Sequence, residues 1–313
     1  MKTEGKLMKK VLFATTALVA TAGMAAAEVS FGGFGRFGLF YQENANPAVD
    51  ETRIEQRFRL TVTGTTTSDN GLEFEGRIRF QSDENAAGAS NVVNRSAPGF
   101  AVSTGGFRLD VGHVSDVIDS GDVVNYYGYG VGLTSFIEQS SGHGLPAFGF
   151  GTSADGATID PTVKLRYTAG DFTVSASYTD AVNEEFQIGV GYNFGNYSAG
   201  IAFGTAENGV GPGVDNDFVA ASFGGEIGAL AFSLLITDQD TNPDTGYGFS
   251  VKYDIGAATE IRFAYSESGA AGANTDAYGI GFRHSLGGGV SLQGGIGDNG
   301  GNTTADLGVI FNF

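Results

Sequence analysis

The sequence predicts an all-β fold, a single 16-stranded antiparallel transmembrane β-barrel. Apolar and polar side chains alternate in segments of about ten residues, the length and period of a strand that crosses a membrane. Thr303–Phe313 is the clearest segment, and its apolar parity holds Ala305, Leu307, Val309, Phe311 and Phe313. Short and long polar connections take turns along the chain. After residue 27, no amphipathic period of 3.6 persists for more than a turn or two. These observations favour a barrel over a helical or mixed fold.

The first 27 residues are predicted to be a cleaved signal peptide. A basic region with Lys2, Lys6, Lys9 and Lys10 comes first. It precedes the apolar run Val11–Ala22, which is too short to span a bilayer, and the small-residue cleavage site Ala25–Ala27. A short buried helix is the competing interpretation. The prediction divides the chain into residues 1–27, which are removed, and a barrel of residues 28–313.

Composition excludes several classes of protein. The chain has no cysteine, which excludes a disulfide framework and a thiolate metal site. Its net charge is −18, and subtracting the four lysines and one glutamate of residues 1–27 leaves 13 basic and 34 acidic residues, or −21. Such a charge argues against nucleic acid as a partner. It is compatible with a surface that meets water, cations or lipopolysaccharide bridged by divalent ions.

The strands are justified in chain order by alternation and by flanking Gly, Asn, Asp and Ser clusters. The first eight predicted strands are Val29–Tyr41, Arg53–Thr63, Leu72–Gln81, Phe100–Thr104, Phe107–His113, Thr162–Ala169, Phe172–Thr179 and Phe186–Phe194. The second eight are Tyr197–Gly204, Phe218–Phe223, Ala229–Thr237, Tyr247–Tyr253, Thr259–Ser266, Ala277–His284, Val290–Gly297 and Thr303–Phe313. Short turns such as Gly105–Gly106 alternate with longer loops such as Thr205–Asp217, as expected when the two rims of a membrane barrel differ.

One connection, from about Val114 to Pro161, is far longer than the rest, and loops of this length are usually functional. With this loop, the start EVSFGGFGRFGLFY at Glu28, the strand count and the terminal Phe313, the chain resembles the trimeric porins of Gram-negative outer membranes, of the Rhodobacter-like kind. The resemblance covers residues 28–313. It implies a homotrimer in the cell outer membrane, in contact with lipid and lipopolysaccharide. It also implies a third loop folded into each barrel, and passive diffusion of ions and small hydrophilic solutes through a water-filled pore.

Charged side chains indicate which face lines the pore. Arg57 and Arg59 alternate with Phe58 and Leu60, so charge lies on one face of the strand and large apolar groups on the other. The predicted basic wall of a pore constriction contains Arg36, Arg57, Arg59, Arg77 and Arg79. The predicted acidic partner, on the long loop, contains Asp116, Asp119, Asp122 and Glu138. Opposed rows of charge would set ion preference.

The register of this wall follows from the turn between its strands. If that turn centres near residue 68, Arg57 faces Arg79 and Arg59 faces Arg77. Like charges directly opposite destabilise a sheet by up to about 1 kcal/mol per pair, so such a square of arginines calls for a function. A solvated face, whose arginines pair with Glu55, Glu73 and Glu75, is the competing interpretation.

Other functions are weighed on the same residues. No Ser–His–Asp set or metal-ligand cluster can be argued from spacing, so no catalytic residue and no cofactor are predicted. His113 and His284 lie at strand ends on the lipid-facing parity. Loop-bound Ca²⁺ is weighed against plain loop solvation for three acid groups: Asp238, Asp240 and Asp244; Asp215 and Asp217; Glu184 and Glu185. A substrate-selective channel, an outer-membrane barrel enzyme and a secreted soluble β-protein remain the alternatives.

Overall fold

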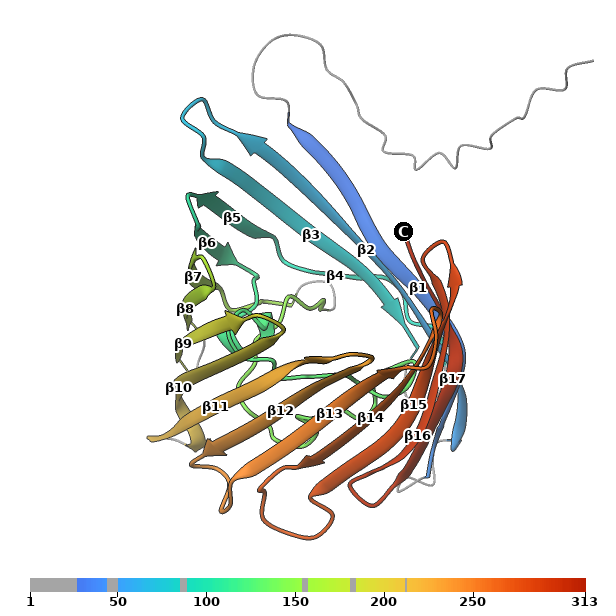
Figure 1. Ribbon diagram of the computed structural model, residues 1–313. Helices are drawn as coiled ribbons and strands as arrows, with labels where there is room; N and C mark the ends of the chain where they lie inside the picture. The colour runs from blue at the N-terminus through green and yellow to red at the C-terminus, as the bar shows by residue number, and fades with distance from the viewer. Residues whose placement is uncertain (1–26, 44–49, 85–88, 154–156, 181–183, 212) are drawn as a thin grey trace, which may run out of the picture.

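The computed structural model is a single closed antiparallel barrel (Figure 1). It describes residues 27–43, 50–84, 89–153, 157–180, 184–211 and 213–313. The predicted signal peptide therefore lies outside the described residues, except for Ala27. No helix among the described residues is long and apolar enough to span a membrane.

The barrel wall has 16 positions, as predicted. The first strands are β1 (Glu28–Gln42), β2 (Thr52–Thr67), β3 (Glu73–Asp83), β4 (Asn94–Arg95), β5 (Gly99–Thr104), β6 (Phe107–Gly112), β7 (Thr162–Ala169), β8 (Phe172–Thr179) and β9 (Glu185–Phe194). The others are β10 (Tyr197–Gly211), β11 (Val214–Ile227), β12 (Leu230–Gln239), β13 (Gly246–Asp254), β14 (Thr259–Glu267), β15 (Asp276–Gly287), β16 (Val290–Asn299) and β17 (Thr303–Asn312). The short strands β4 and β5 pair with different parts of β3 and share one position in the wall.

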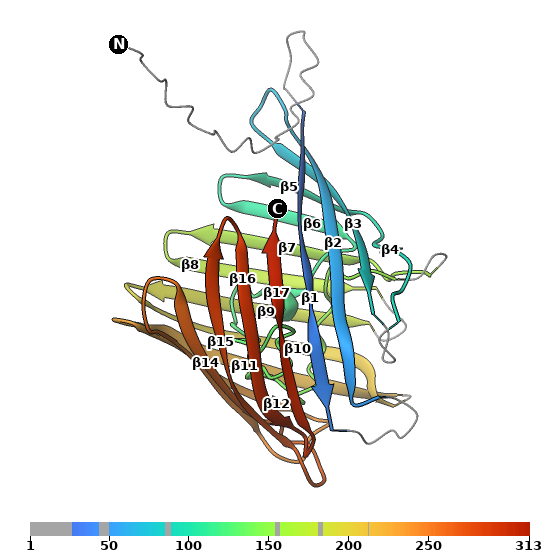
Figure 2. The same ribbon diagram turned by 90° about the vertical axis from the view of Figure 1, so that its right-hand side faces the viewer.

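The seam of the barrel joins its first and last strands. β1 pairs antiparallel with both β2 and β17, and the three strands run side by side (Figure 2). Backbone hydrogen bonds of 3.0 and 3.1 Å link Gly33 and Phe313 in both directions. The Phe313 ring stacks on Phe58 at 5.6 Å. The sheet therefore has no open edge, which satisfies the backbone groups that a membrane could not solvate.

The two faces of the wall meet different solvents. Along β9, Glu185 and Gln187 point inward and are buried, whereas Phe186 and Ile188 point outward and are exposed. Outward-facing rings also form a belt near the short turns, where neighbouring centroids lie 4.3 to 6.2 Å apart. This belt includes Phe172, Tyr192, Phe194, Tyr197 and Phe223. An apolar outer band edged by aromatic rings is the pattern of a barrel in lipid.

The strands at the β10–β11 hairpin are longer than the sequence prediction. The predicted loop Thr205–Asp217 is mostly strand, because β10 reaches Gly211 and β11 begins at Val214. Polar residues on these strand ends obscured the pairing, which continues through Thr205↔Asp217 and Ala206↔Asn216. This hairpin extends the wall on the long-loop rim.

The segment between β6 and β7 lies inside the barrel, where it carries the short helix α1 (Val117–Ser120) (Figure 1). Its apolar side chains form the buried core with residues of the inner wall rather than with other loops. The loop contributes Val117, Ile118, Val123, Val124, Tyr126 and Leu145 to this core, and the wall contributes Ala202, Phe218, Ala220 and Leu235. The third connection is therefore folded into the barrel, as the resemblance implied.

Glycines of the inner wall let the loop backbone approach closely. A Cβ on Gly200 would lie 1.6 Å from the carbonyl oxygen of Val123, and one on Gly248 would lie 1.9 Å from that of Gln139. Because real Cβ atoms do not come within 3.0 Å of other heavy atoms, only glycine fits at these two positions. The wall is thus shaped to seat this segment.

Candidate pore constriction

The predicted arginines all lie on the lumen side of neighbouring strands, but the predicted β2–β3 register is wrong. Arg57 pairs with Asp83 and Arg59 with Gln81, while Arg79 faces Thr61 and Arg77 faces Thr63. The turn holds five residues, with Ser68 N–H donating to the Leu72 carbonyl at 2.8 Å and Gly71 at φ 82°. Its centre is therefore residue 70, two residues beyond the predicted one. This register removes the direct opposition of like charges across β2 and β3.

Two of the arginines have carboxylate partners. The Arg36 Nε lies 2.5 Å from Glu55 Oε1, and Arg57 pairs with Asp83 across the strands. Arg36 and Arg57 do face each other across β1 and β2, and the two carboxylates offset that repulsion. The competing interpretation, in which arginines pair with acids of the strands, therefore applies to Arg36 and Arg57.

The other three arginines have no ion pair with a carboxylate among the described residues. Arg59 donates to the amide oxygen of Gln81. The guanidinium carbons of Arg77 and Arg79 lie 4.4 and 4.5 Å from the centre of the Phe150 ring, and Arg79 also donates to the Phe150 carbonyl. The loop thus meets the basic wall through an aromatic side chain, which the sequence prediction missed. Phe150 follows no charge pattern that could have identified it.

Asp116 is placed as an anchor rather than as a pore-facing charge. It is fully buried and caps α1, accepting from the Asp119 N–H at 2.7 Å. It also accepts from the Gln187 amide at 3.1 Å and from the Phe148 N–H. Burial raises the pKa of Asp116 to about 6.

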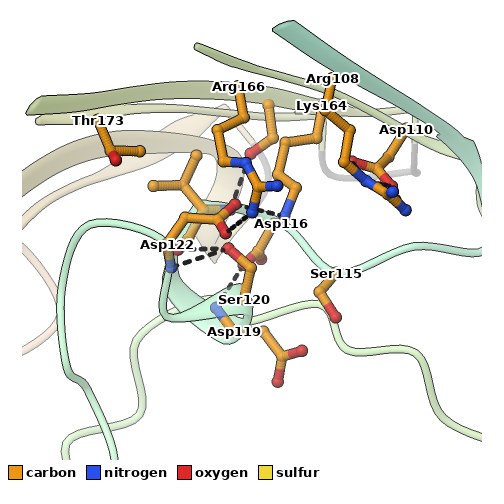
Figure 3. Close-up of polar contacts among 12 residues, drawn as sticks. Arg108, Asp110, Ser115, Asp116, Asp119, Ser120, Asp122, Lys164, Arg166 and Thr173 are labelled. Carbon is orange, nitrogen blue, oxygen red and sulfur yellow. Dashed lines mark hydrogen bonds and ion pairs between the residues drawn. The ribbon is translucent and has the colours of Figure 1, made fainter. Parts of the chain in front are cut away.

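Asp122 anchors the loop to strand β7 through two ion pairs. Its carboxylate lies 2.8 Å from Lys164 Nζ and 2.7 Å from Arg166, both on β7 (Figure 3). Its side chain is 9% exposed, so water screens these pairs less than it would on an open surface. The two basic residues hold the pKa of Asp122 below its usual range.

Of the four predicted loop acids, Asp119 lies beside Phe150, whose ring contacts Arg77 and Arg79, because a Cβ on Gly149 would come 2.9 Å from the Asp119 carboxylate oxygens. Figure 3 shows its carboxylate turned away from Asp122. Asp119 accepts from the Tyr127 hydroxyl at 2.9 Å and attracts Arg79 electrostatically. Glu138 is half-buried in the loop, and burial raises its pKa to about 7. The structure thus places one acid, not four, opposite the basic wall.

A second group of basic residues lies on β13–β15 and is absent from the predicted site. Lys252, Arg262 and Arg283 surround the single carboxylate of Glu260 at 4.0, 2.6 and 3.9 Å. Arg262 also donates to the Gly130 carbonyl of the loop at 3.2 Å. Their strand parity was a usable signal, since each alternates with apolar neighbours.

His113 and His143 make contacts between the loop and its surroundings. His113 is buried and lies edge-on to Phe150 at 5.4 Å, so its prediction as a lipid-facing residue is wrong. The chain leaves the strand at Gly112 and turns inward, which reverses the parity argument. His143 bonds Thr237 at 2.7 Å from inside the loop, and burial lowers its pKa to about 4. Within the described ranges, no three His, Cys, Asp or Glu residues are grouped to hold a metal ion. The Ca²⁺ prediction for the acid groups therefore stays a prediction.

Comparison with known proteins gives consistent matches over most of the chain. The model of the family described as Gram-negative porin matches residues 14–304. A porin of Fuscovulum blasticum is 32% identical over 301 residues, and a porin of Rhodobacter capsulatus is 26% identical over 329, each match covering 91% of this chain and all of the relative. A solved variant of the Rhodopseudomonas blastica porin superposes with a TM-score of 0.79 at 27% identity, over 91% of this chain and all of the other. A second variant gives a TM-score of 0.77 with the same identity and coverage.

Proposed function

Because the chain belongs to the Gram-negative porin family, and is thus an outer-membrane channel and not an enzyme, we propose that ions and small hydrophilic solutes diffuse passively past a constriction between the arginines and the infolded loop. The basic wall of this constriction is Arg36, Arg57, Arg59, Arg77 and Arg79. Asp119 carries the opposing charge, Asp116 and Asp122 hold the loop in place, and Glu138 is half-buried within the loop. The observation that carries the proposal is the contact of Arg77 and Arg79 with Phe150, because it joins the loop to the basic wall inside the barrel.

The constriction would select by size and by charge. The loop fills one side of the lumen because its core packs on β10–β12. On the other side, Arg59, Arg77 and Arg79 face Asp119 without carboxylate partners of their own among the described residues. Rings and rows of fixed charge in a narrow aqueous passage determine which ions enter it. Polar solutes would align in the field between the two sides, and bulky solutes would be excluded.

The proposal includes a cleaved export signal in residues 1–27, a homotrimeric assembly and contact with outer-membrane lipid and lipopolysaccharide. Family membership and the outward apolar band support the assembly and the lipid contact. Acid residues crowd the rim of the long loops, as where Asp217 N–H meets Asp240 at 3.4 Å. Divalent ions could bridge such carboxylates to anionic lipid headgroups. Cross-linking of the detergent-purified protein would count the subunits, and mass spectrometry of the purified chain would locate its N-terminus.

The channel is tested in a planar lipid bilayer under a salt gradient. Stepwise insertions, especially in threes, would support a water-filled trimeric pore, and an absence of conductance from folded protein would overturn the proposal. The variant R59Q/R79Q should shift the reversal potential toward cations. The matched control R59K/R79K keeps both charges and should not. An unchanged reversal potential in the glutamine variant would refute the assignment of the constriction.

A further inference from the structure

Acidic side chains are concentrated at one rim of the barrel, although Asp69, Asp171 and Asp254 lie at the short turns of the other. Between Arg166 and Lys252 the chain has no lysine or arginine. The acids of this stretch lie mostly near the ends of strands that meet the long loops, and they include Asp180, Glu207, Asp215, Asp217, Asp238 and Asp240. At the same rim, Glu267, Asp276 and Asp298 lie at the ends of β14, β15 and β16. The mouth formed by the long loops is therefore strongly negative.

The opposite pattern holds where the loop crosses the lumen. We define the basic ring as Arg59, Arg77 and Arg79 on one wall and Lys252, Arg262 and Arg283 on the other. Both walls contact the same loop, since Arg79 donates to the Phe150 carbonyl and Arg262 to that of Gly130. The basic ring therefore lies at the level of the loop, between the acidic mouth and the short turns.

The charge of this ring is only partly compensated. On β13–β15, three cations share the single carboxylate of Glu260 as their ion-pair partner. On β2 and β3, the three arginines form no ion pair with a carboxylate among the described residues, and Asp119 is the loop acid near them. Side chains of the ring are 14–42% exposed on β13–β15, so their charge reaches the water of the lumen.

We propose that this axial separation makes the channel rectify, so that it conducts ions better in one direction than in the other. The inference rests on the proposed function, because it requires an open water-filled pore. The acidic mouth concentrates cations and the basic ring concentrates anions. A voltage that is positive on the long-loop side drives cations from the mouth inward and anions from the ring outward, so both carriers collect where the two regions meet. The reverse voltage drains both carriers from that junction, and the current falls.

Salt concentration provides a direct test of the electrostatic origin. The Debye length is about 10 Å at 0.1 M and about 3 Å at 1 M. Fixed charges therefore control the carriers across the lumen at the lower concentration and only near the wall at the higher one. Rectification that comes from these charges should be present in 0.1 M KCl and lost in 1 M KCl. Rectification that comes from pore shape alone would not depend on salt in this way.

The experiment records current–voltage curves of single pores in a planar bilayer with symmetric KCl. Since the chain has no cysteine, A271C in the exposed loop between β14 and β15 provides a unique label. A bulky membrane-impermeant maleimide, added to one chamber, then reports which side the long loops face. The expected result is a larger conductance when the long-loop side is positive in 0.1 M KCl, and equal conductance at both polarities in 1 M KCl.

Two variants remove charge from the two walls of the ring. K252Q/R262Q/R283Q and R59Q/R77Q should each reduce the asymmetry, and the second variant separates no ion pair among the described residues. The control K252R/R262K/R283K keeps every charge and should rectify like the parent. A symmetric current in 0.1 M KCl, an asymmetry that persists in 1 M KCl, or an asymmetry that both glutamine variants retain would overturn the proposal. An absence of any pore would instead overturn the proposed function.

Discussion

The loop backbone at Val123 lies directly against Gly200 of the inner wall, so a methyl group added at Gly200 should have a predictable effect. In G200A the new Cβ would lie 1.6 Å from the Val123 carbonyl oxygen, so it must move away by at least about 1.4 Å to reach the 3.0 Å limit of real contacts. β10 is fixed between β9 and β11 by ladders on both sides, so the loop should yield rather than the strand. The loop can move only toward the lumen, because the wall lies behind it.

Two quantities should therefore change together. Overpacking of this kind costs about 1–3 kcal/mol of folding free energy, which should lower the unfolding temperature of the barrel in detergent. The displaced loop should also narrow the lumen on that side, so the single-channel conductance should fall. G248A should act in the same direction, because its Cβ would lie 1.9 Å from the Gln139 carbonyl oxygen.

The matched control is G64A on β2, where an added Cβ would meet nothing within 4 Å. Neither Gly64 nor Gly200 has a positive φ, so backbone strain does not separate the two substitutions. G64A should leave both the unfolding temperature and the conductance close to those of the parent. If G200A matched G64A in both measurements, the close approach of the loop to the wall would be refuted.

Three further predictions concern the anchors of the loop. D122N removes the ion pairs with Lys164 and Arg166, so we expect a lower unfolding temperature. The loss of unfolding free energy should be below the about 3–5 kcal/mol of fully buried pairs, because Arg166 is 36% exposed. An unchanged unfolding temperature would contradict the role of Asp122 as an anchor. Burial raises the pKa of Asp116 to about 6, so its protonated form stabilises the fold below its unfolded pKa of about 4, and this contribution is lost as pH rises through 6. Unfolding temperatures between pH 4 and 8 should therefore fall less steeply in D116N, and identical slopes would refute the assignment. F150A removes two cation–π contacts worth about 0.5–1 kcal/mol each and frees Arg77 and Arg79, so the reversal potential should move toward anions, whereas no shift would contradict the contact.

The strands were predictable because their signal is local. Alternation of side chains is a property of each segment, and every predicted segment overlaps a strand of the structure. The short strand β5 was also identified from alternation, whereas β4, which completes its position in the wall, was not predicted. Strand ends were less predictable, since polar residues continue the ladder beyond the apolar band in β10 and β11.

The site was predictable in composition but not in pairing. Parity identified the arginines of β1–β3 as lumen residues, yet a turn centred two residues beyond its predicted position changed every partner across β2 and β3. The acids of the loop could not be sorted from sequence, because Asp116, Asp119 and Asp122 lie within seven residues and differ only in where the folded loop directs them. Phe150 and Lys164 gain their roles from contacts between segments distant in sequence, on which no local pattern reports.

The tip of the infolded loop, at Leu133 and Thr134, contacts the seam between β1 and β17, and this contact has a consequence for the order of assembly. Asp306 on β17 accepts hydrogen bonds of 2.8 Å from the backbone N–H groups of Leu133 and Thr134. Leu133 also fits over Gly38 of β1 and Gly308 of β17, where a Cβ would come within 3.0 Å of it. The tip therefore rests on the two strands that are farthest apart in the sequence and that pair only when the sheet closes. An incompletely closed sheet would lack this support, so the narrow passage can reach its final form only after the wall is complete.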